Sequence, residues 1–267
     1  MNTVQKRLFA IILVVSLFAS FAVGNVDAGG KSESDSSAIN ELVICYLPNS
    51  MTEELAEYRN MIQGAMSKAI GIKVTEINVA DYNAVVEAMR TKKADIANFG
   101  PVTYVQAVER AGAEAFVIPA PFGNKTLSGY TTRIVTKADS PIRSLMDLRG
   151  KTFAYVDPSS TSGNYVPVLE LMNAFPGTTS EYFYANGKFF ASVMYSGTHQ
   201  NGVNAVIHGD VDAAPVASNI LDREIQAGRI NAKDIKVIHE SQLIPGSPWA
   251  IRSNMPEDLK RKIRNFR

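Results

Sequence analysis

The sequence predicts an α/β fold made of two open sheets with helices on both faces. Apolar runs of strand length alternate with longer segments of helical periodicity along most of the 267-residue chain, which is typical of open α/β sheets. About ten such runs are present, which is more strands than one small sheet contains. The length also suits one large domain or two small ones. We therefore expect two α/β lobes.

The first half of the chain is predicted from its periodicity and its helix-ending residues. One helix is expected over residues 52–70, and its core-facing positions are expected to be Leu55, Tyr58, Ile62, Ala65 and Ala69. Gly71 is expected to cap the end of this helix. Asp81 is expected to cap a second helix that runs to Arg90, and Gly100-Pro101 to open a third. Strands are predicted over 42–47, 73–79, 96–99, 115–119 and 130–136.

The second half continues the alternation. Strands are predicted over 152–156, 189–195, 211–214 and 235–239, with helices over 165–174, 199–207 and 217–227 between them. Asp210 and Asp212 lie at the start of the third of these strands, and the pair is interpreted as structural rather than catalytic.

Composition and charge exclude several classes of function. The formal net charge is +1, which argues against nucleic-acid binding. The single cysteine, Cys45, excludes a disulfide framework and a cysteine-built zinc site, and is interpreted as a small apolar residue of a buried strand. No nucleophile elbow, phosphate-binding loop or zinc-protease motif is present, and the three histidines lack metal-ligand spacing. We therefore expect no enzyme activity, no metal and no cofactor.

The first 28 residues have the three-part pattern of a secretory signal. Lys6 and Arg7 precede an apolar run over residues 8–23, and small residues follow at Val26-Asp27-Ala28. The alternative, a transmembrane anchor, needs about 20 apolar residues. Removal of residues 1–28 leaves 25 basic and 25 acidic residues. Residues 29–40 are Ser-rich and polar, and are expected to form a disordered tether.

Two polar loops follow predicted strands, where open α/β sheets place their ligands. Residues 157–164 read D-P-S-S-T-S-G-N, and residues 196–201 read S-G-T-H-Q-N. Hydroxyl groups and the free N–H groups of a helix N-terminus together cradle an oxyanion without a counter-cation. From the residues alone, a Ser-rich surface turn and a capping histidine remain the alternatives.

The chain resembles the phosphonate/phosphite substrate-binding proteins of ABC importers. The stretches that carry the resemblance occur in the family's order: D-Y at 81–82, A-D-I-A-N-F-G-P at 94–101, S-P-I-R-S-L-M-D-L-R-G-K at 140–151, D-P-S-S-T-S-G at 157–163, S-G-T-H at 196–199, V-D-A-A at 211–214 and I-P-G-S-P-W at 244–249. The resemblance covers most of the chain from residue 41 onward.

The resemblance implies a two-lobed periplasmic-binding-protein fold, type II-like, with mixed sheets and a ligand cleft between the lobes. Lobe one is expected to take residues 41–129 and 246–267, and lobe two residues 137–238. Residues 130–136 and 239–245 are expected to be the hinge strands. A final helix is expected over 256–267, with Leu259 and Ile263 facing inward. Family members usually continue further, so a truncated chain or a shortened lobe one is expected.

The same resemblance implies the site. The expected oxyanion cradle is Ser160, Thr161, Ser162 and His199, faced by Tyr82 and Tyr130. Asn219 and Ser247 stand where acidic side chains are expected to hold the ammonium of an aminoalkylphosphonate, and neither carries a negative charge. The segment Pro248-Trp249-Ala250, next to Ser247, is expected to close off the space for a longer substituent, with Trp249 in the pocket wall. The expected site contains no Lys or Arg.

The function implied is that of an extracytoplasmic receptor. It is expected to capture phosphite or a small, methylphosphonate-like phosphonate and deliver it to a membrane permease and its ATPase, serving phosphorus uptake. The alternatives are another tetrahedral oxyanion such as phosphate, a larger phosphonate, a secreted enzyme acting on phosphorus compounds, or a sensory receptor.

Overall fold

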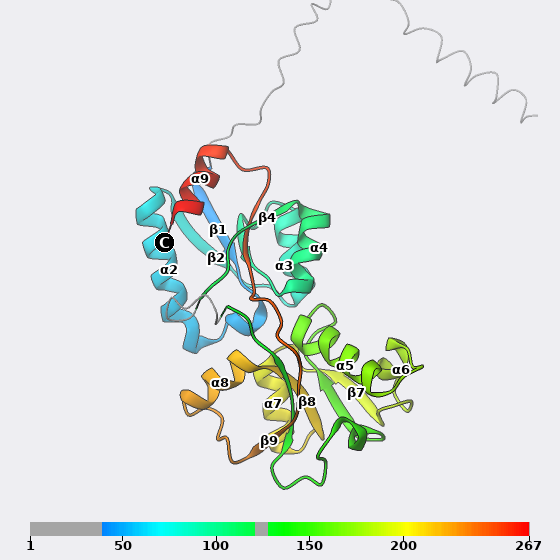
Figure 1. Ribbon diagram of the computed structural model, residues 1–267. Coiled ribbons are helices and arrows are strands. Elements are labelled where there is room, and N and C mark those ends of the chain that lie inside the picture. Colours follow the sequence, from blue (N-terminus) through cyan, green and yellow to red (C-terminus); the bar gives the residue numbers. More distant parts are fainter. Residues whose placement is uncertain (1–38, 121–127, 267) are drawn as a thin grey trace, which may run out of the picture. The chain divides into compact units, whose positions relative to one another are not determined.

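The computed structural model describes residues 39–120 and 128–266, which form one compact unit built on two five-stranded sheets (Figure 1). The predicted signal and nearly all of the tether, to residue 38, lie outside the described residues. We call the elements on the first sheet lobe one and those on the second sheet lobe two. The predicted fold class, two mixed sheets flanked by helices, is confirmed.

Lobe one has the strand order β2-β1-β3-β10-β4. Strands β1 and β2, and β1 and β3, pair in parallel, whereas β10 runs antiparallel to both of its neighbours, β3 and β4. The strand bounds are β1 Glu41–Cys45, β2 Lys73–Ile77, β3 Ile96–Asn98, β4 Ala113–Val117 and β10 Trp249–Arg252.

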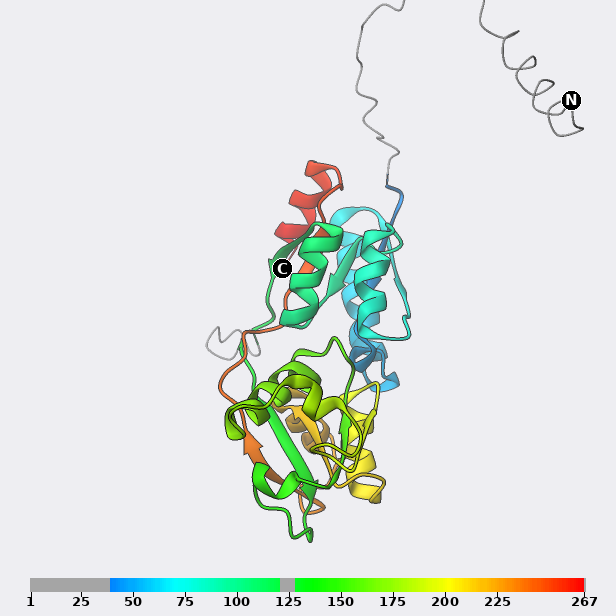
Figure 2. The same cartoon turned by 90° about the vertical axis from the view of Figure 1, so that its right-hand side faces the viewer.

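Helices cover both faces of this sheet. Helices α3 (Tyr82–Arg90) and α4 (Pro101–Ala111) pack on one face, and α2 (Ala56–Ile70) and α9 (Glu257–Asn265) pack on the other (Figures 1 and 2). Asp81 caps α3 by accepting from the Ala84 N–H, as predicted. Pro101 opens α4, as predicted.

The predicted core face of α2 is wrong. Tyr58 is 52% exposed, and Ala65 and Ala69 are also exposed. The buried positions are instead Arg59, Met66 and Ile70. The helix can bury Arg59 because the guanidinium donates to Glu76 at 3.1 Å and to two backbone carbonyl oxygens at 2.9 Å. The buried side of the helix thus carries Met66 and Ile70, with Ile62 packed beside them, and the paired Arg59 extends this side by two turns.

Lobe two has the strand order β7-β6-β8-β5-β9, again with parallel and antiparallel pairs. Its elements are β5 Thr132–Lys137, β6 Thr152–Tyr155, α5 Val166–Ala174, α6 Ser180–Tyr184, β7 Ser192–Tyr195, α7 His199–His208, β8 Ala213–Ala217, α8 Ser218–Gln226 and β9 Ile235–Glu240. The strand predicted from residue 189 begins only at Ser192, because Phe189 and Phe190 turn into an aromatic cluster of the core.

The chain passes between the sheets twice. It enters lobe two at β5 and returns after β9 to insert β10 into lobe one. A short antiparallel bridge joins the two passages, with the Tyr130 N–H donating to Ile244 O at 3.1 Å and the Ile244 N–H to Tyr130 O at 2.7 Å. The sequence reasoning predicted no strand at β10.

We expect Arg59→Ala to lower the free energy of unfolding by about 3 kcal/mol, because removing one partner of a buried ion pair leaves the other uncompensated. Arg90→Ala, which removes an arginine that is 51% exposed in its side chain and paired with Glu87, is the matched control and should cost less than about 1 kcal/mol. Urea unfolding of both variants measures the difference. Equal losses would show that the burial of Arg59 contributes nothing.

Candidate functional site

A small cavity of about 140 Å³ lies at the ends of strands from both lobes. Eight of the nine residues predicted for the site line it, and these are Tyr82, Tyr130, Ser160, Thr161, Ser162, His199, Asn219 and Ser247. They come from α3, from the passages between the sheets, and from the loops that follow β6, β7 and β8. The structure thus gathers residues that are up to 165 positions apart in the sequence.

The loop after β6, residues 157–164, which we call the serine loop, is shaped by its own hydrogen bonds. The Ser160 hydroxyl oxygen accepts from the Gly163 N–H at 3.0 Å, and the Tyr165 N–H donates to Ser160 O at 3.1 Å to close a π-helical turn over Thr161–Tyr165. Gly163 packs directly against β6, since a Cβ at this position would lie 2.3 Å from Cβ of Val156. Such single π-helical turns are frequent at functional sites.

Thr161 contacts lobe one. Its hydroxyl oxygen accepts from the Val102 N–H, in the first turn of α4, at 2.9 Å. This N–H belongs to the group at a helix N-terminus that has no partner within the helix. Because this bond uses only the oxygen, the hydroxyl hydrogen of Thr161 can still donate to another acceptor.

His199 begins α7 and is 2% exposed. The Ala217 N–H donates to Nδ1 at 3.3 Å, and in the tautomer that this bond requires the ring proton is on Nε2, which lies 3.3 Å from the Ser162 hydroxyl oxygen. Burial is the main cause that lowers the pKa of His199 to about 4; a hydrogen bond with the Pro215 backbone opposes this effect, and the positive charge of Arg223 adds to it. At neutral pH His199 is therefore an uncharged N–H donor beside the serine loop.

The two tyrosines are also uncharged donors. Burial raises the pKa of Tyr82, and its hydroxyl donates to Asn49 Oδ1 at 3.1 Å. Burial likewise raises the pKa of Tyr130, while hydrogen bonds with Ser162 and Ser247 lower it in part. Asp157 accepts from the Tyr82 backbone N–H at 3.2 Å, which joins the serine loop to the start of α3.

The expectation for Trp249 is wrong. This residue lies in β10 and does not line the cavity; its ring meets Tyr46 edge-on, with the ring centroids 5.4 Å apart. The reason is that β10 pairs with β3 and β4, which orients the indole toward the α2 side of the sheet. Ser247 precedes this strand and remains in the cavity.

The expectation that the site holds no Lys or Arg is also wrong, because Arg223 lines the cavity. The sequence contained a signal for it. Arg223 follows Asn219 by four positions in α8, so both lie on one face of the helix. Asn49 and Asn98, which the sequence reasoning did not assign, line the cavity as well.

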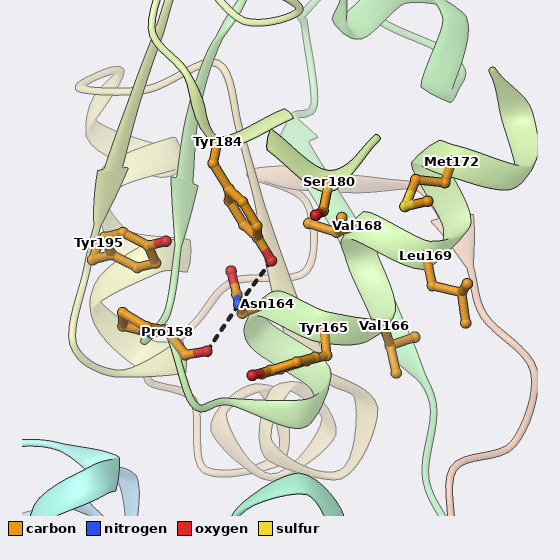
Figure 3. A pocket seen from close by; sticks show the side chains of 10 residues that line it. All are labelled: Pro158, Asn164, Tyr165, Val166, Val168, Leu169, Met172, Ser180, Tyr184 and Tyr195. Atoms are coloured by element: carbon orange, nitrogen blue, oxygen red, sulfur yellow. Dashed lines mark hydrogen bonds between the residues drawn. The ribbon is translucent and has the colours of Figure 1, made fainter. Parts of the chain in front are cut away.

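A larger groove of about 570 Å³ lies on lobe two, beside the serine loop (Figure 3). Its lining is mostly apolar and aromatic, and includes Val166, Leu169 and Tyr195. Asn164 at its edge donates to Pro158 O and to the Tyr184 hydroxyl (Figure 3). With no charged side chain in its lining, the groove does not suit an oxyanion.

Comparison with known proteins identifies the family. Residues 44–266 match the family model described as the periplasmic substrate-binding protein of phosphonate ABC transporters. The chain belongs to this family. The relatives are substrate-binding transport proteins.

Three relatives show how far the similarity extends. The phosphonates-binding periplasmic protein of Escherichia coli is 29% identical over 263 residues, which are 96% of this chain and 73% of the relative. A phosphate-import protein of Mycolicibacterium smegmatis is 28% identical over 84% of this chain and 70% of its own length. The crystal structure of a phosphonate transporter binding protein from Pseudomonas aeruginosa superimposes with a TM-score of 0.74 at 28% identity, over 85% of this chain and 73% of that one.

Two further observations concern the described residues. Cys45 is fully buried in β1, and burial raises its pKa to about 12, in agreement with its interpretation as an apolar core residue. None of the helices within residues 39–120 and 128–266 has the length and apolar character needed to cross a membrane.

The buried His199 predicts a pH dependence of stability. Its folded-state pKa of about 4 lies below the ordinary 6.5, so between these values the unfolded chain binds a proton that the folded chain does not. Stability should therefore fall by up to about 3 kcal/mol as the pH drops from 6.5 to 4.

Urea unfolding across this range measures the loss, and His199→Gln should show a flatter profile. His208→Gln, at the exposed far end of α7, is the control and should keep the wild-type profile. Identical profiles for wild type and His199→Gln would contradict the prediction.

Proposed function

We propose that this protein captures phosphite or a small, methylphosphonate-like phosphonate outside the cytoplasm and delivers it to a membrane permease powered by an ATPase. The observation that carries the proposal is the small cavity, in which Ser160, Thr161, Ser162 and His199 present uncharged donors from the loops after two neighbouring strands. Residues 1–28 act in this proposal as a cleaved export signal.

The size of the cavity supports a small ligand. A water molecule takes roughly 30 Å³ of liquid volume, so about 140 Å³ has room for about five water-sized groups. A phosphorus atom with three oxygens and one methyl group is of this size. The cavity is also well below the roughly 300 Å³ at which ordinary small-molecule sites begin.

The chemistry of the lining supports an oxyanion. Hydroxyl groups, an imidazole N–H and the N–H groups that begin helices can surround the oxygens of a phosphonate. Uncharged donors become stronger when water is excluded, and they leave release of the ligand possible. Ser162 and His199 are each at most 3% exposed, so they form a rigid, dehydrated part of the cavity.

Phosphate is the second candidate, because the Mycolicibacterium smegmatis relative is named for its import. A phosphate that keeps one P–OH group at neutral pH must donate that proton to an acceptor. The lining of the cavity contains no carboxylate, which would be the strongest acceptor for this proton, and the side-chain oxygens of Asn49 and Asn98 each already accept one hydrogen bond, from the Tyr82 hydroxyl and the Leu47 N–H. The acceptors that remain are weaker hydroxyl and amide oxygens. This favours a ligand with P–H or P–C in place of P–OH.

Calorimetric titration of the chain lacking residues 1–28 should show tighter binding of phosphite or methylphosphonate than of phosphate or 2-aminoethylphosphonate. The reasons are the small cavity and the lack of a carboxylate for an ammonium group at Asn219 and Ser247. Tight binding of 2-aminoethylphosphonate with none of phosphite would contradict the assigned ligand class.

Thr161→Ala should weaken binding of the preferred ligand at least tenfold, because it removes a charge-assisted hydrogen bond to an oxyanion. Ser159→Ala is the matched control, since Ser159 lies in the same loop and does not line the cavity. Its affinity should stay within about twofold of wild type. An unchanged affinity in Thr161→Ala would show that the loop is only a structural turn.

A further inference from the structure

Arg223 is the charged side chain among the residues that line the cavity. It lies one helical turn after Asn219 in α8, and Asn219 and Ser247 are where the substituent on phosphorus is expected. Its side chain is 38% exposed overall, but its Nε is buried and has no hydrogen-bond partner among the described residues. A buried donor without a partner is energetically unfavourable and is available to a ligand.

The nearby carboxylate of Glu224 forms a long ion pair with Nη2 of Arg223 and leaves Nε without a partner within residues 39–120 and 128–266. The Arg223 Nη2 lies 3.4 Å from Glu224 Oε1, longer than the roughly 2.7–2.9 Å of a charge-assisted bond. Glu224 has a closer partner in Arg229, whose Nε lies 2.5 Å from Oε2, and it also accepts from Gln200 at 3.5 Å. Burial raises the pKa of Glu224, but the bonds and charges of Arg229 and Arg223 bring it below its ordinary value.

The positive charge of Arg223 acts on His199, which lies beside the serine loop in the cavity. After burial itself, the field of Arg223 is what lowers the pKa of His199, the residue whose Nε2 faces Ser162. A cation that disfavours a second positive charge on His199 also disfavours one on a ligand held beside it. The same field favours a negative ligand.

We propose that Arg223 sets the charge of the ligand, admitting oxyanions whose substituent on phosphorus is uncharged or negative and excluding those that carry an ammonium group. This inference rests on the proposed function and adds a specificity residue to it. Asn219 and Ser247 carry no negative charge to attract an ammonium, whereas Arg223 adds repulsion. Specificity commonly uses both kinds of change.

The test compares two ligands of nearly equal size, aminomethylphosphonate and ethylphosphonate, each one heavy atom larger than methylphosphonate, in which an ammonium replaces a terminal methyl group. Calorimetry on the wild-type chain lacking residues 1–28 should show ethylphosphonate binding at least tenfold more tightly. In Arg223→Gln the ratio of the two affinities should fall below threefold. Arg223→Lys keeps the charge and should keep most of the preference, which guards against a loss that comes only from altered packing.

Arg133→Gln is the control for long-range charge. It removes one positive charge next to α8, where Arg133 pairs with Asp222, but Arg133 does not line the cavity. In Arg133→Gln the ratio of the affinities for the two matched phosphonates should equal the wild-type ratio. Methylphosphonate and phosphite are titrated against every variant.

The outcomes separate this inference from the proposed function. A ratio unchanged in Arg223→Gln, or a wild-type preference for aminomethylphosphonate, overturns the role of Arg223. Binding of methylphosphonate but of neither longer phosphonate also overturns it, because size and not charge then sets specificity. Failure of phosphite, methylphosphonate and both longer phosphonates overturns the proposed function together with the inference.

Discussion

The close contact between Gly163 and Val156 is the constraint on which the cavity depends. The backbone of Gly163 lies where a Cβ would come within 2.3 Å of Val156, so the chain turns back directly against the end of β6. The Gly163 O also accepts from the Val156 N–H at 2.9 Å, and its N–H bonds to Ser160. With these groups fixed, Thr161 and Ser162 have few conformations left and lose little entropy when a ligand binds.

The donors of the cavity are kept neutral by burial, with one cation beside them. Ser162, His199 and Tyr130 are buried, which keeps the imidazole and the phenol uncharged near neutral pH. Neutral donors alone distinguish weakly between ligands that differ in charge at a distance from phosphorus. Arg223 supplies that distinction from α8, outside the serine loop, so recognition of the oxyanion and selection of its substituent come from different elements.

Much of this could be predicted from the sequence because the signals are local. Strand–helix alternation, the caps at Asp81 and Gly71, and the two loops after β6 and β7 depend on residues close together in the chain. The predictions that failed needed distant partners. Burial of Arg59 depends on Glu76, and the orientation of Trp249 depends on the insertion of β10 between β3 and β4. Helical spacing places Arg223 on the same face of α8 as Asn219, but no residue of that segment shows that this face lines the cavity.

Thr161 connects binding with the contact between the lobes. Its hydroxyl oxygen accepts from Val102 at the start of α4, and its hydrogen is available to a ligand oxygen. A hydroxyl that donates to an anion becomes a stronger acceptor, so an oxyanion at this site strengthens the bond to α4. The same polarisation runs in reverse, because the N–H of α4 makes Thr161 a better donor. In the proposed function, capture of the ligand and the contact between lobe one and lobe two are thus coupled through the uncharged side chain of Thr161.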